Sequence, residues 1–218
     1  MNDHNTPLAD IGLIGLAVMG ENLALNMERR GFRVAVYNRT PEKTRAFMAG
    51  RAAGKRFVAA DSLKTLVQHL QRPRRVMLMV KAGAPVQKAI ETLVPLLEPG
   101  DIIIDGGNSN YRDTERRVAE LEQVGLHYLG TGVSGGEEGA LKGPAIMPGG
   151  SVAAWDVLRP LFEAIAARAP DGAPCCRWMG PGGGRTLRQN GPQRDRIRRH
   201  AAHCRGLSHH AGRAETAW

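Results

Sequence analysis

Short apolar runs rich in β-branched residues alternate along this chain with longer amphipathic stretches. The runs predict buried strands at Ile11–Gly15, Phe32–Tyr37, Arg75–Val80, Asp101–Ile104, Leu126–Leu129 and Ala145–Met147. The stretches predict helices at Glu21–Arg30, Pro41–Ala49, Ser62–Leu70, Pro85–Leu97, Thr114–Val124 and Ala153–Ala167. Repeated β-α units build a parallel sheet, because each helix returns the chain to the end where the previous strand began. The sequence therefore predicts an α/β fold with a doubly wound, mostly parallel sheet and helices on both faces.

The composition is that of a chain that buries a core: of 218 residues, 42% are hydrophobic and 23% are charged. These values exclude wholesale disorder, collagen-like repetition and a disulfide-stapled miniprotein. The chain shows no signal-peptide pattern and no apolar run approaching about 20 residues, so we expect no membrane span and a cytoplasmic protein. Cys175, Cys176 and Cys204 lack metal-ligand spacing, so we expect reduced cysteines and no metal site.

Basic residues gather at the end of the chain. Residues 185–218 hold eight arginines against Asp195 and Glu215, a net charge of 8 − 2 = +6 out of the total of +9, which leaves 9 − 6 = +3 for the first 184 residues. Three branched aliphatic residues in this segment follow no helical or alternating pattern, so it cannot build a core. We expect a folded domain over residues 1–183 and a disordered or irregular basic tail over residues 184–218.

The first predicted strand leads through a glycine-rich turn, Gly12-Leu-Ile-Gly15-Leu-Ala17-Val-Met-Gly20, into a helix. A dinucleotide pyrophosphate needs a tight turn, a backbone that it can approach closely and free N–H groups at a helix start. Gly15 and Gly20 meet the first and last needs, whereas Ala17 replaces the usual middle glycine of a Rossmann-type fold. The candidate cofactor residues are Gly15, Leu16, Ala17, Val18, Met19 and Gly20. The alternative is a similar turn that binds no ligand.

The second predicted strand indicates which dinucleotide would bind. An NAD site places a carboxylate about 20 residues after the first glycine to accept from the ribose 2′-hydroxyl, whereas a 2′-phosphate requires positive charge. The strand here ends Tyr37-Asn38-Arg39-Thr40, without a carboxylate. Arg39 can pair with a 2′-phosphate, and Thr40 can add a donor. We therefore expect NADP, with Asn38, Arg39 and Thr40 as candidates; the alternative is a solvated Arg39 beside Thr40 as a helix cap.

Several segments together resemble one enzyme family. They are Gly15-Leu-Ala-Val-Met-Gly-Glu-Asn-Leu-Ala-Leu-Asn, Tyr37-Asn-Arg-Thr, Val80-Lys-Ala, Asp105-Gly-Gly-Asn-Ser, Gly130-Thr-Gly-Val-Ser-Gly-Gly-Glu-Glu-Gly-Ala and Met147-Pro-Gly-Gly. From about Ile11 to Gly183 the chain resembles 6-phosphogluconate dehydrogenase, the NADP-dependent decarboxylating enzyme of the pentose phosphate pathway, in which alanine at the Ala17 position is usual. The resemblance implies that the cofactor contacts Val80, Lys81, Ala82 and Asn108. It also implies that 6-phosphogluconate contacts Asn108, Ser134, Gly135 and Gly136.

The segment that handles protons in this family has no counterpart here. Family members oxidise the C3 hydroxyl by hydride transfer to NADP, lose carbon dioxide and protonate the enediol to ribulose 5-phosphate, which needs a base and an acid. The resemblance implies a lysine and a glutamate on a helix after the Gly-Pro-Gly-Gly turn, within Ala-Gly-His-Phe-Val-Lys-Met-Val-His-Asn-Gly-Ile-Glu-Tyr. This chain instead continues Gly184-Arg-Thr-Leu-Arg-Gln-Asn-Gly-Pro-Gln-Arg-Asp-Arg-Ile, and no lysine follows Lys142.

A shift of reading frame accounts for that departure. If each codon takes the last base of one family codon and the first two of the next, Phe-Val yields CGT for Arg188, Val-Lys yields CAA for Gln189 and Lys-Met yields AAT for Asn190. The agreement continues through Ile197. We therefore expect a one-base insertion or a two-base deletion near the codons of Gly182–Gly184, which splits the catalytic lysine codon between Gln189 and Asn190.

The expected product is a truncated chain that binds NADP but is catalytically incompetent. It lacks the catalytic lysine and glutamate, the all-helical C-terminal domain of the family and its dimer interface. One alternative is another β-hydroxyacid dehydrogenase, such as one for hydroxyisobutyrate, although the Asp105 and Ser134 segments favour the phosphogluconate branch. The other is incidental binding of polyanions through the arginine-rich tail. We expect no specific nucleic-acid partner, because Trp218 is the one aromatic residue of that tail.

Overall fold

The computed structural model describes residues 7–181, and in them seven strands form one sheet in the order β3-β2-β1-β4-β5-β6-β7. The strands are β1 Ile11–Ile14, β2 Val34–Tyr37, β3 Phe57–Ala59, β4 Arg75–Leu78, β5 Ile102–Asp105, β6 His127–Ser134 and β7 Ala145–Gly150. β1 to β6 are parallel, and β7 is antiparallel to β6. The strand order reverses between β1 and β4. In doubly wound sheets, ligands bind at the carboxyl ends of the strands flanking such a reversal.

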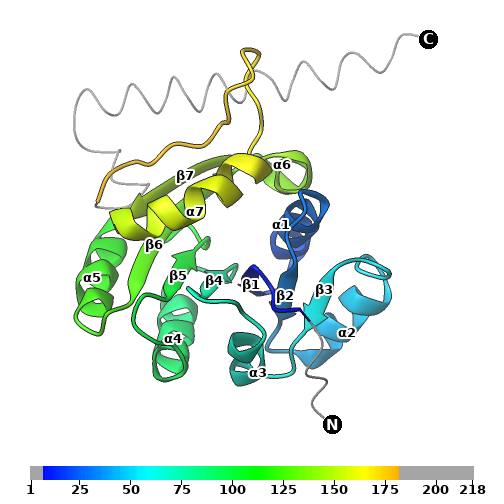
Figure 1. Ribbon diagram of the computed structural model, residues 1–218, viewed down its shortest axis with the longest axis horizontal. Coiled ribbons are helices and arrows are strands. Elements are labelled where there is room, and N and C mark those ends of the chain that lie inside the picture. Colours follow the sequence, from blue (N-terminus) through cyan, green and yellow to red (C-terminus); the bar gives the residue numbers. More distant parts are fainter. Residues whose placement is uncertain (1–6, 182–218) are drawn as a thin grey trace.

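Helices cover both faces of the sheet (Figure 1). One face carries α1 Val18–Arg29, α2 Pro41–Ala49 and α7 Val152–Ile165, and the other carries α3 Leu63–Gln68, α4 Ala84–Leu93 and α5 Tyr111–Glu122. A 3-10 turn, Val94–Leu96, follows α4, and α6 Gly136–Lys142 lies beside α1. Alternate strand residues enter the two cores: Ile102 and Ile104 pack on the α1 side, and Ile103 packs on the α4 side. Burial on both faces explains the unbroken apolar runs of the sequence.

The predicted fold class is confirmed, and the structure contains each predicted strand and helix with somewhat different ends. α2 has the predicted bounds, and Ser62 caps α3 by accepting from Thr65 N at 3.1 Å. β3 has no counterpart among the predicted strands. Its three residues pair with β2 at the edge of the sheet, where a strand needs no long apolar run.

β6 is longer than the predicted strand Leu126–Leu129. Its second half is antiparallel to β7, with Gly130 opposite Gly149 and Gly132 opposite Met147. Glycine is depleted in strands, so the sequence of this half resembles a turn. The glycine is required by packing, because a Cβ on Gly130 would lie 2.7 Å from the Thr114 side chain of α5.

After α7 the chain runs along the outer side of β7. Ile146 N donates to Cys175 O at 2.9 Å, and Gly150 N donates to Gly180 O at 2.9 Å. The backbone from Cys175 to Gly180 is therefore held against the last strand of the sheet. It forms the final part of the chain that the structure describes.

The two cysteines of this segment differ. Cys176 is a free, buried thiol, and burial raises its pKa to about 12. Cys175 is disulfide-bonded, so the prediction that both cysteines are reduced is wrong for Cys175.

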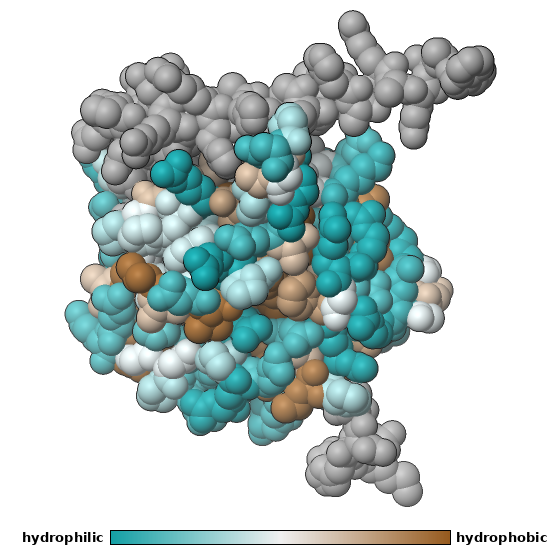
Figure 2. Space-filling model, turned by 45° about the horizontal axis from the view of Figure 1, so that its top comes forward, coloured by the Kyte–Doolittle hydropathy of each residue, from teal (hydrophilic) through white to brown (hydrophobic). Residues whose placement is uncertain are grey.

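The face shown in Figure 2 is mainly hydrophilic, with hydrophobic residues in small separate patches. Among residues 7–181, the exposed large hydrophobic side chains are Leu8, Val18, Val124 and Val152. Within residues 7–181 no helix has the length and apolar character needed to cross a membrane. The same residues contain no group of three or more His, Cys, Asp or Glu side chains placed to hold a metal ion. The predicted tail, residues 184–218, lies outside the described residues.

Candidate functional site

Two glycines shape the β1-α1 turn. Gly15 has a φ of +104°, and a Cβ there would lie 2.5 Å from Met79 O, just beyond β4. A Cβ on Gly20 would lie 1.9 Å from Gly15 O. A side chain at either position would have to displace backbone, so these residues are glycine because the turn packs directly on its neighbours.

The first turn of α1 presents backbone N–H groups at the carboxyl edge of the sheet. Ala17 is the N-cap residue and provides no side-chain cap. The first N–H groups of a helix have no acceptor within that helix, and the helix dipole makes this end positive. Val18 is 49% exposed, so the helix start is open to solvent. The predicted residues from Leu16 to Met19 therefore lie where an anion can bind.

Asn38 connects the end of β2 to this turn. Its Oδ1 accepts from Leu16 N at 3.0 Å, and its Nδ2 donates to Thr40 O at 3.1 Å. Both ends of the side chain thus bond backbone, and Asn38 aligns the glycine turn with the β2-α2 loop. Its predicted contact with the cofactor stays a prediction.

Arg39 and Thr40 are exposed at the carboxyl end of β2, the strand next to β1. Thr40 is the N-cap residue of α2, and Pro41 follows at the start of the helix. The Thr40 side chain makes no capping hydrogen bond, so its hydroxyl can donate to a ligand. The two residues predicted to recognise a 2′-phosphate therefore face solvent beside the glycine turn.

The loops after β4 and β5 lie against each other. Gly106 N donates to Leu78 O at 2.9 Å. A Cβ on Gly107 would lie 2.5 Å from Val80 O and 3.5 Å from Ala82 N. Asn108 follows with a φ of +60°, a left-handed conformation that asparagine adopts more readily than most residues. The structure thus brings the Val80-Lys81-Ala82 loop next to the loop that carries Asn108.

A buried polar network that the sequence analysis did not predict holds the β5-α5 loop. Asp105 Oδ1 accepts from Gly107 N at 2.8 Å, and its Oδ2 accepts from Tyr128 Oη at 2.8 Å and from Arg117 Nη1 at 3.2 Å. Arg117 Nη1 also donates to Ser109 Oγ at 3.1 Å. Burial, aided by the charge of Asp105, raises the pKa of Tyr128, so its hydroxyl stays protonated and donates. We call these four side chains, Asp105, Ser109, Arg117 and Tyr128, the Asp105 network.

The β6-α6 turn holds the residues predicted to contact the sugar acid. Ser134 is the last residue of β6, Gly135 is the N-cap of α6 with a φ of +135°, and Gly136 begins the helix with a φ of +65°. These dihedrals favour glycine, and both glycines are exposed next to the half-buried Ser134.

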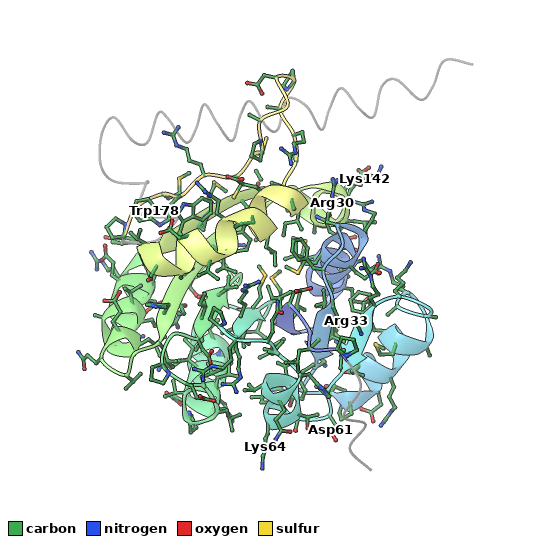
Figure 3. All side chains as sticks on the ribbon, in the orientation of Figure 1. Arg30, Arg33, Asp61, Lys64, Lys142 and Trp178 are labelled. Atoms are coloured by element: carbon green, nitrogen blue, oxygen red, sulfur yellow. The ribbon has the colours of Figure 1, made fainter. Side chains whose placement is uncertain are left out.

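α6 runs parallel to α1. Near their starts, Asn22 Nδ2 donates to Glu137 O at 2.9 Å, and near their ends Arg29 Nη2 donates to Leu141 O at 2.7 Å. Figure 3 shows Arg30 and Lys142 at the same corner of the molecule, where the two helices end. The starts of α1 and α6 therefore lie side by side, which places the predicted substrate turn next to the predicted cofactor turn.

The fold and this edge of the sheet define the class of protein: a Rossmann-type dinucleotide-binding domain. A family profile described as the NAD binding domain of 6-phosphogluconate dehydrogenase matches residues 10–180. The chain belongs to this family.

Known relatives agree with that assignment. The decarboxylating 6-phosphogluconate dehydrogenase of Treponema pallidum (strain Nichols) is 62% identical over 175 residues, which are 80% of this chain and 36% of that protein. The chain thus spans about a third of the length of the curated relatives that it matches. The solved structure of Plasmodium falciparum 6-phosphogluconate dehydrogenase, studied without ligand, with NADP+ and with 6-phosphogluconate, superimposes with a TM-score of 0.75 at 43% identity. That match covers 79% of this chain and 37% of the other.

A second branch of the fold is more distant. The 3-hydroxyisobutyrate dehydrogenase of Salmonella typhimurium superimposes with a TM-score of 0.66 at 24% identity, covering 82% of this chain and 59% of the other. This likeness shows a shared fold. The higher identity to the phosphogluconate enzymes supports the branch that the Asp105 and Ser134 segments predict.

Proposed function

We propose that residues 1–183 bind NADP. The observation that carries this proposal is the position of Arg39: exposed at the end of β2, in a loop without a carboxylate, beside a glycine turn that the Leu16–Asn38 hydrogen bond holds in place. If Arg39 and Thr40 bind the 2′-phosphate, the pyrophosphate of the same ligand would lie at the N-terminus of α1. The family, which includes a protein studied with NADP+, supports the same cofactor.

The remaining predicted contacts follow the order of the strands. With the adenosine at β2 and the pyrophosphate at β1, the nicotinamide would lie toward β4 and β5, against Val80, Lys81, Ala82 and Asn108. Bound NADP would supply a hydride acceptor. Asn108, the Ser134 hydroxyl and the N–H groups of Gly135 and Gly136 would bind the hydroxyls or carboxylate of 6-phosphogluconate.

We further propose that this chain, expected in the cytoplasm, does not turn over 6-phosphogluconate. The residues after Gly183 carry no lysine, and the codon agreement supports a change of reading frame at Gly182–Gly184. The nearby Glu138 does not replace the missing acid, because it accepts from Lys142 Nζ at 2.8 Å and this ion pair lowers its pKa. Sequencing the coding region at these glycine codons tests the frame change directly.

Calorimetric titration with NADPH and NADH tests cofactor binding. We expect NADPH to bind at least about tenfold more tightly, since a charge-assisted pair with the 2′-phosphate contributes about 1.5–3 kcal/mol. Arg39→Ala should bring the two affinities together. The matched control is Arg45→Ala in α2, whose guanidinium pairs with Glu42 on the exposed helix surface. Equal binding of both cofactors by the unaltered chain would contradict the NADP assignment.

An activity assay tests the second part. Purified chain mixed with 6-phosphogluconate and NADP should form no NADPH above the rate without protein, while a full-length relative in parallel should form it. NADPH formation by this chain, abolished by Arg39→Ala, would show that the missing lysine and glutamate have been replaced.

A further inference from the structure

Arg117 is a charged side chain in the interior of the domain. It lies on α5 and is only 2% exposed. Its guanidinium donates to five groups: Asp105 Oδ2 at 3.2 Å, Ser109 Oγ at 3.1 Å, Tyr128 Oη at 3.3 Å, Gln87 Oε1 at 3.4 Å and Gly83 O at 3.5 Å. A buried charge persists only where it is paired and hydrogen-bonded, and this set of acceptors meets that need.

The partners of Arg117 belong to two loops at the edge of the sheet. Gly83 ends the loop that begins at Val80, and Gln87 lies in the α4 helix that follows. Asp105 and Ser109 lie on either side of Gly106–Asn108. One planar guanidinium thus bonds the end of the first loop through Nη2 and both ends of the second through Nη1. A lysine ammonium in its place is a point charge without this fork and cannot reach both loops in the same way.

The network also sets the conformation inside the second loop. Asp105, which Arg117 and Tyr128 hold by one carboxylate oxygen, uses the other to accept from Gly107 N at 2.8 Å. Gly107 packs on Val80 O, and Asn108 follows in a left-handed conformation. Such a conformation persists where the surrounding structure determines it.

We infer that Arg117 is a positioning residue for dinucleotide binding: it fixes the spacing between the Val80–Gly83 loop and the Asp105–Ser109 loop, and so forms the half of the site that receives the nicotinamide. This inference rests on the proposed binding of NADP. Arg117 would act through these loops and not by touching the ligand, because its side chain is buried against them. Its effect is confined to the β4 and β5 side of the site, whereas Arg39 and Thr40 lie on the β2 side.

Two ligands allow the two halves of the site to be tested independently. NADPH spans the whole site, whereas 2′,5′-ADP carries only the adenosine with its two phosphates and reaches Arg39 and the start of α1. In calorimetric titrations of the full chain, Arg117→Lys should weaken NADPH binding about tenfold, the size of one charge-assisted hydrogen bond, and leave 2′,5′-ADP binding unchanged within about twofold. The matched control is Arg116→Lys, the neighbouring residue of α5, which pairs with Glu120 and Asp113 on the surface; it should leave both affinities unchanged.

A milder variant provides the same measurement if Arg117→Lys does not fold. Ser109→Ala removes one acceptor of Arg117 and no charge, and should weaken NADPH binding about threefold without affecting 2′,5′-ADP. Unchanged NADPH affinity in both variants would overturn the inference. So would an equal loss of both ligands, which indicates general damage to the domain. If the unaltered chain binds 2′,5′-ADP, the proposed function stands whatever these variants show; if it binds neither ligand, the proposed function fails and the inference fails with it.

Discussion

Tyr128 Oη donates to Asp105 Oδ2 at 2.8 Å, with both side chains fully buried between β5, β6 and α5. Tyr128→Phe removes this donor and leaves the rest of the ring in place. We expect the free energy of unfolding to fall by about 1–3 kcal/mol, because the buried carboxylate loses one of its hydrogen bonds. Urea denaturation measures the loss. Tyr111→Phe, at the half-buried start of α5, removes a hydroxyl that accepts from the exposed Arg112 side chain at 3.2 Å and should change stability by less than about 0.5 kcal/mol.

The same tyrosine predicts a pH dependence. Burial and the neighbouring Asp105 charge raise the pKa of Tyr128 above its unfolded value of about 10. Above that pH the folded chain holds a proton that the unfolded chain releases, so this contribution is present below pH 10 and is lost as pH rises toward the folded-state pKa. The stability difference between wild type and Tyr128→Phe should therefore shrink at alkaline pH, by up to about 1.4 kcal/mol per pH unit. A difference independent of pH up to 11 would contradict this.

Gly20→Ala should disrupt the β1-α1 turn. The added Cβ would lie 1.9 Å from Gly15 O, which forces the helix start away from the turn. We expect a loss of stability of about 1–3 kcal/mol and a weakening of NADPH binding by at least about tenfold. Gly139→Ala in α6 is the matched control, because its Cβ would lie an ordinary 3.8 Å from Ser134 O, and alanine is the better helix former. Thermal melting with and without NADPH distinguishes the two variants.

Asn38→Asp should change cofactor preference more than stability. An aspartate can still accept from Leu16 N, as Asn38 Oδ1 does at 3.0 Å, but it loses the exposed hydrogen bond that Nδ2 donates to Thr40 O and adds negative charge next to Arg39. Because a 2′-phosphate carries like charge, NADPH should lose about tenfold or more in affinity, while NADH, with a ribose hydroxyl for the carboxylate to accept from, should lose little or gain. Equal losses for the two cofactors would indicate that Asn38 only supports the turn.

Deleting residues 184–218 should leave cofactor binding intact. The predicted NADP contacts all lie at or before Asn108, and the segment held against β7 ends at Gly180. We expect the shift in melting temperature caused by NADPH to be the same in the shortened and full-length chains. A shift that disappears with the tail would place part of the binding site in those residues.

The architecture could be predicted because parallel strands buried on both faces produce continuous apolar runs, separated by stretches of helical period. The sheet edges were harder. β3 has only three residues. The second half of β6 contains glycines, and Gly130 is glycine because the Thr114 side chain, distant in sequence, leaves no room for a Cβ. Local propensity cannot reveal a contact that depends on the whole fold.

The Asp105 network likewise combines a feature that the sequence reveals with contacts that depend on the fold. Thr114, Arg117 and Leu121 recur at helical spacing on α5, and this pattern alone places Arg117 on the buried face. Its partners come from separate strands and loops, so no spacing in the sequence indicates which acceptors it meets. The glycine turn and the Tyr37–Thr40 segment were accessible from sequence because their chemistry is contained in adjacent residues.

The segment that follows α7 hydrogen-bonds to the outer edge of β7. The N–H groups of Ile146 and Gly150, which would otherwise point outward from the last strand, donate to the carbonyl oxygens of Cys175 and Gly180. This segment therefore covers an edge of the sheet along which a neighbouring chain could otherwise add a strand. The β7 side of the domain is thereby shielded from strand pairing with other molecules, a route by which folded domains aggregate.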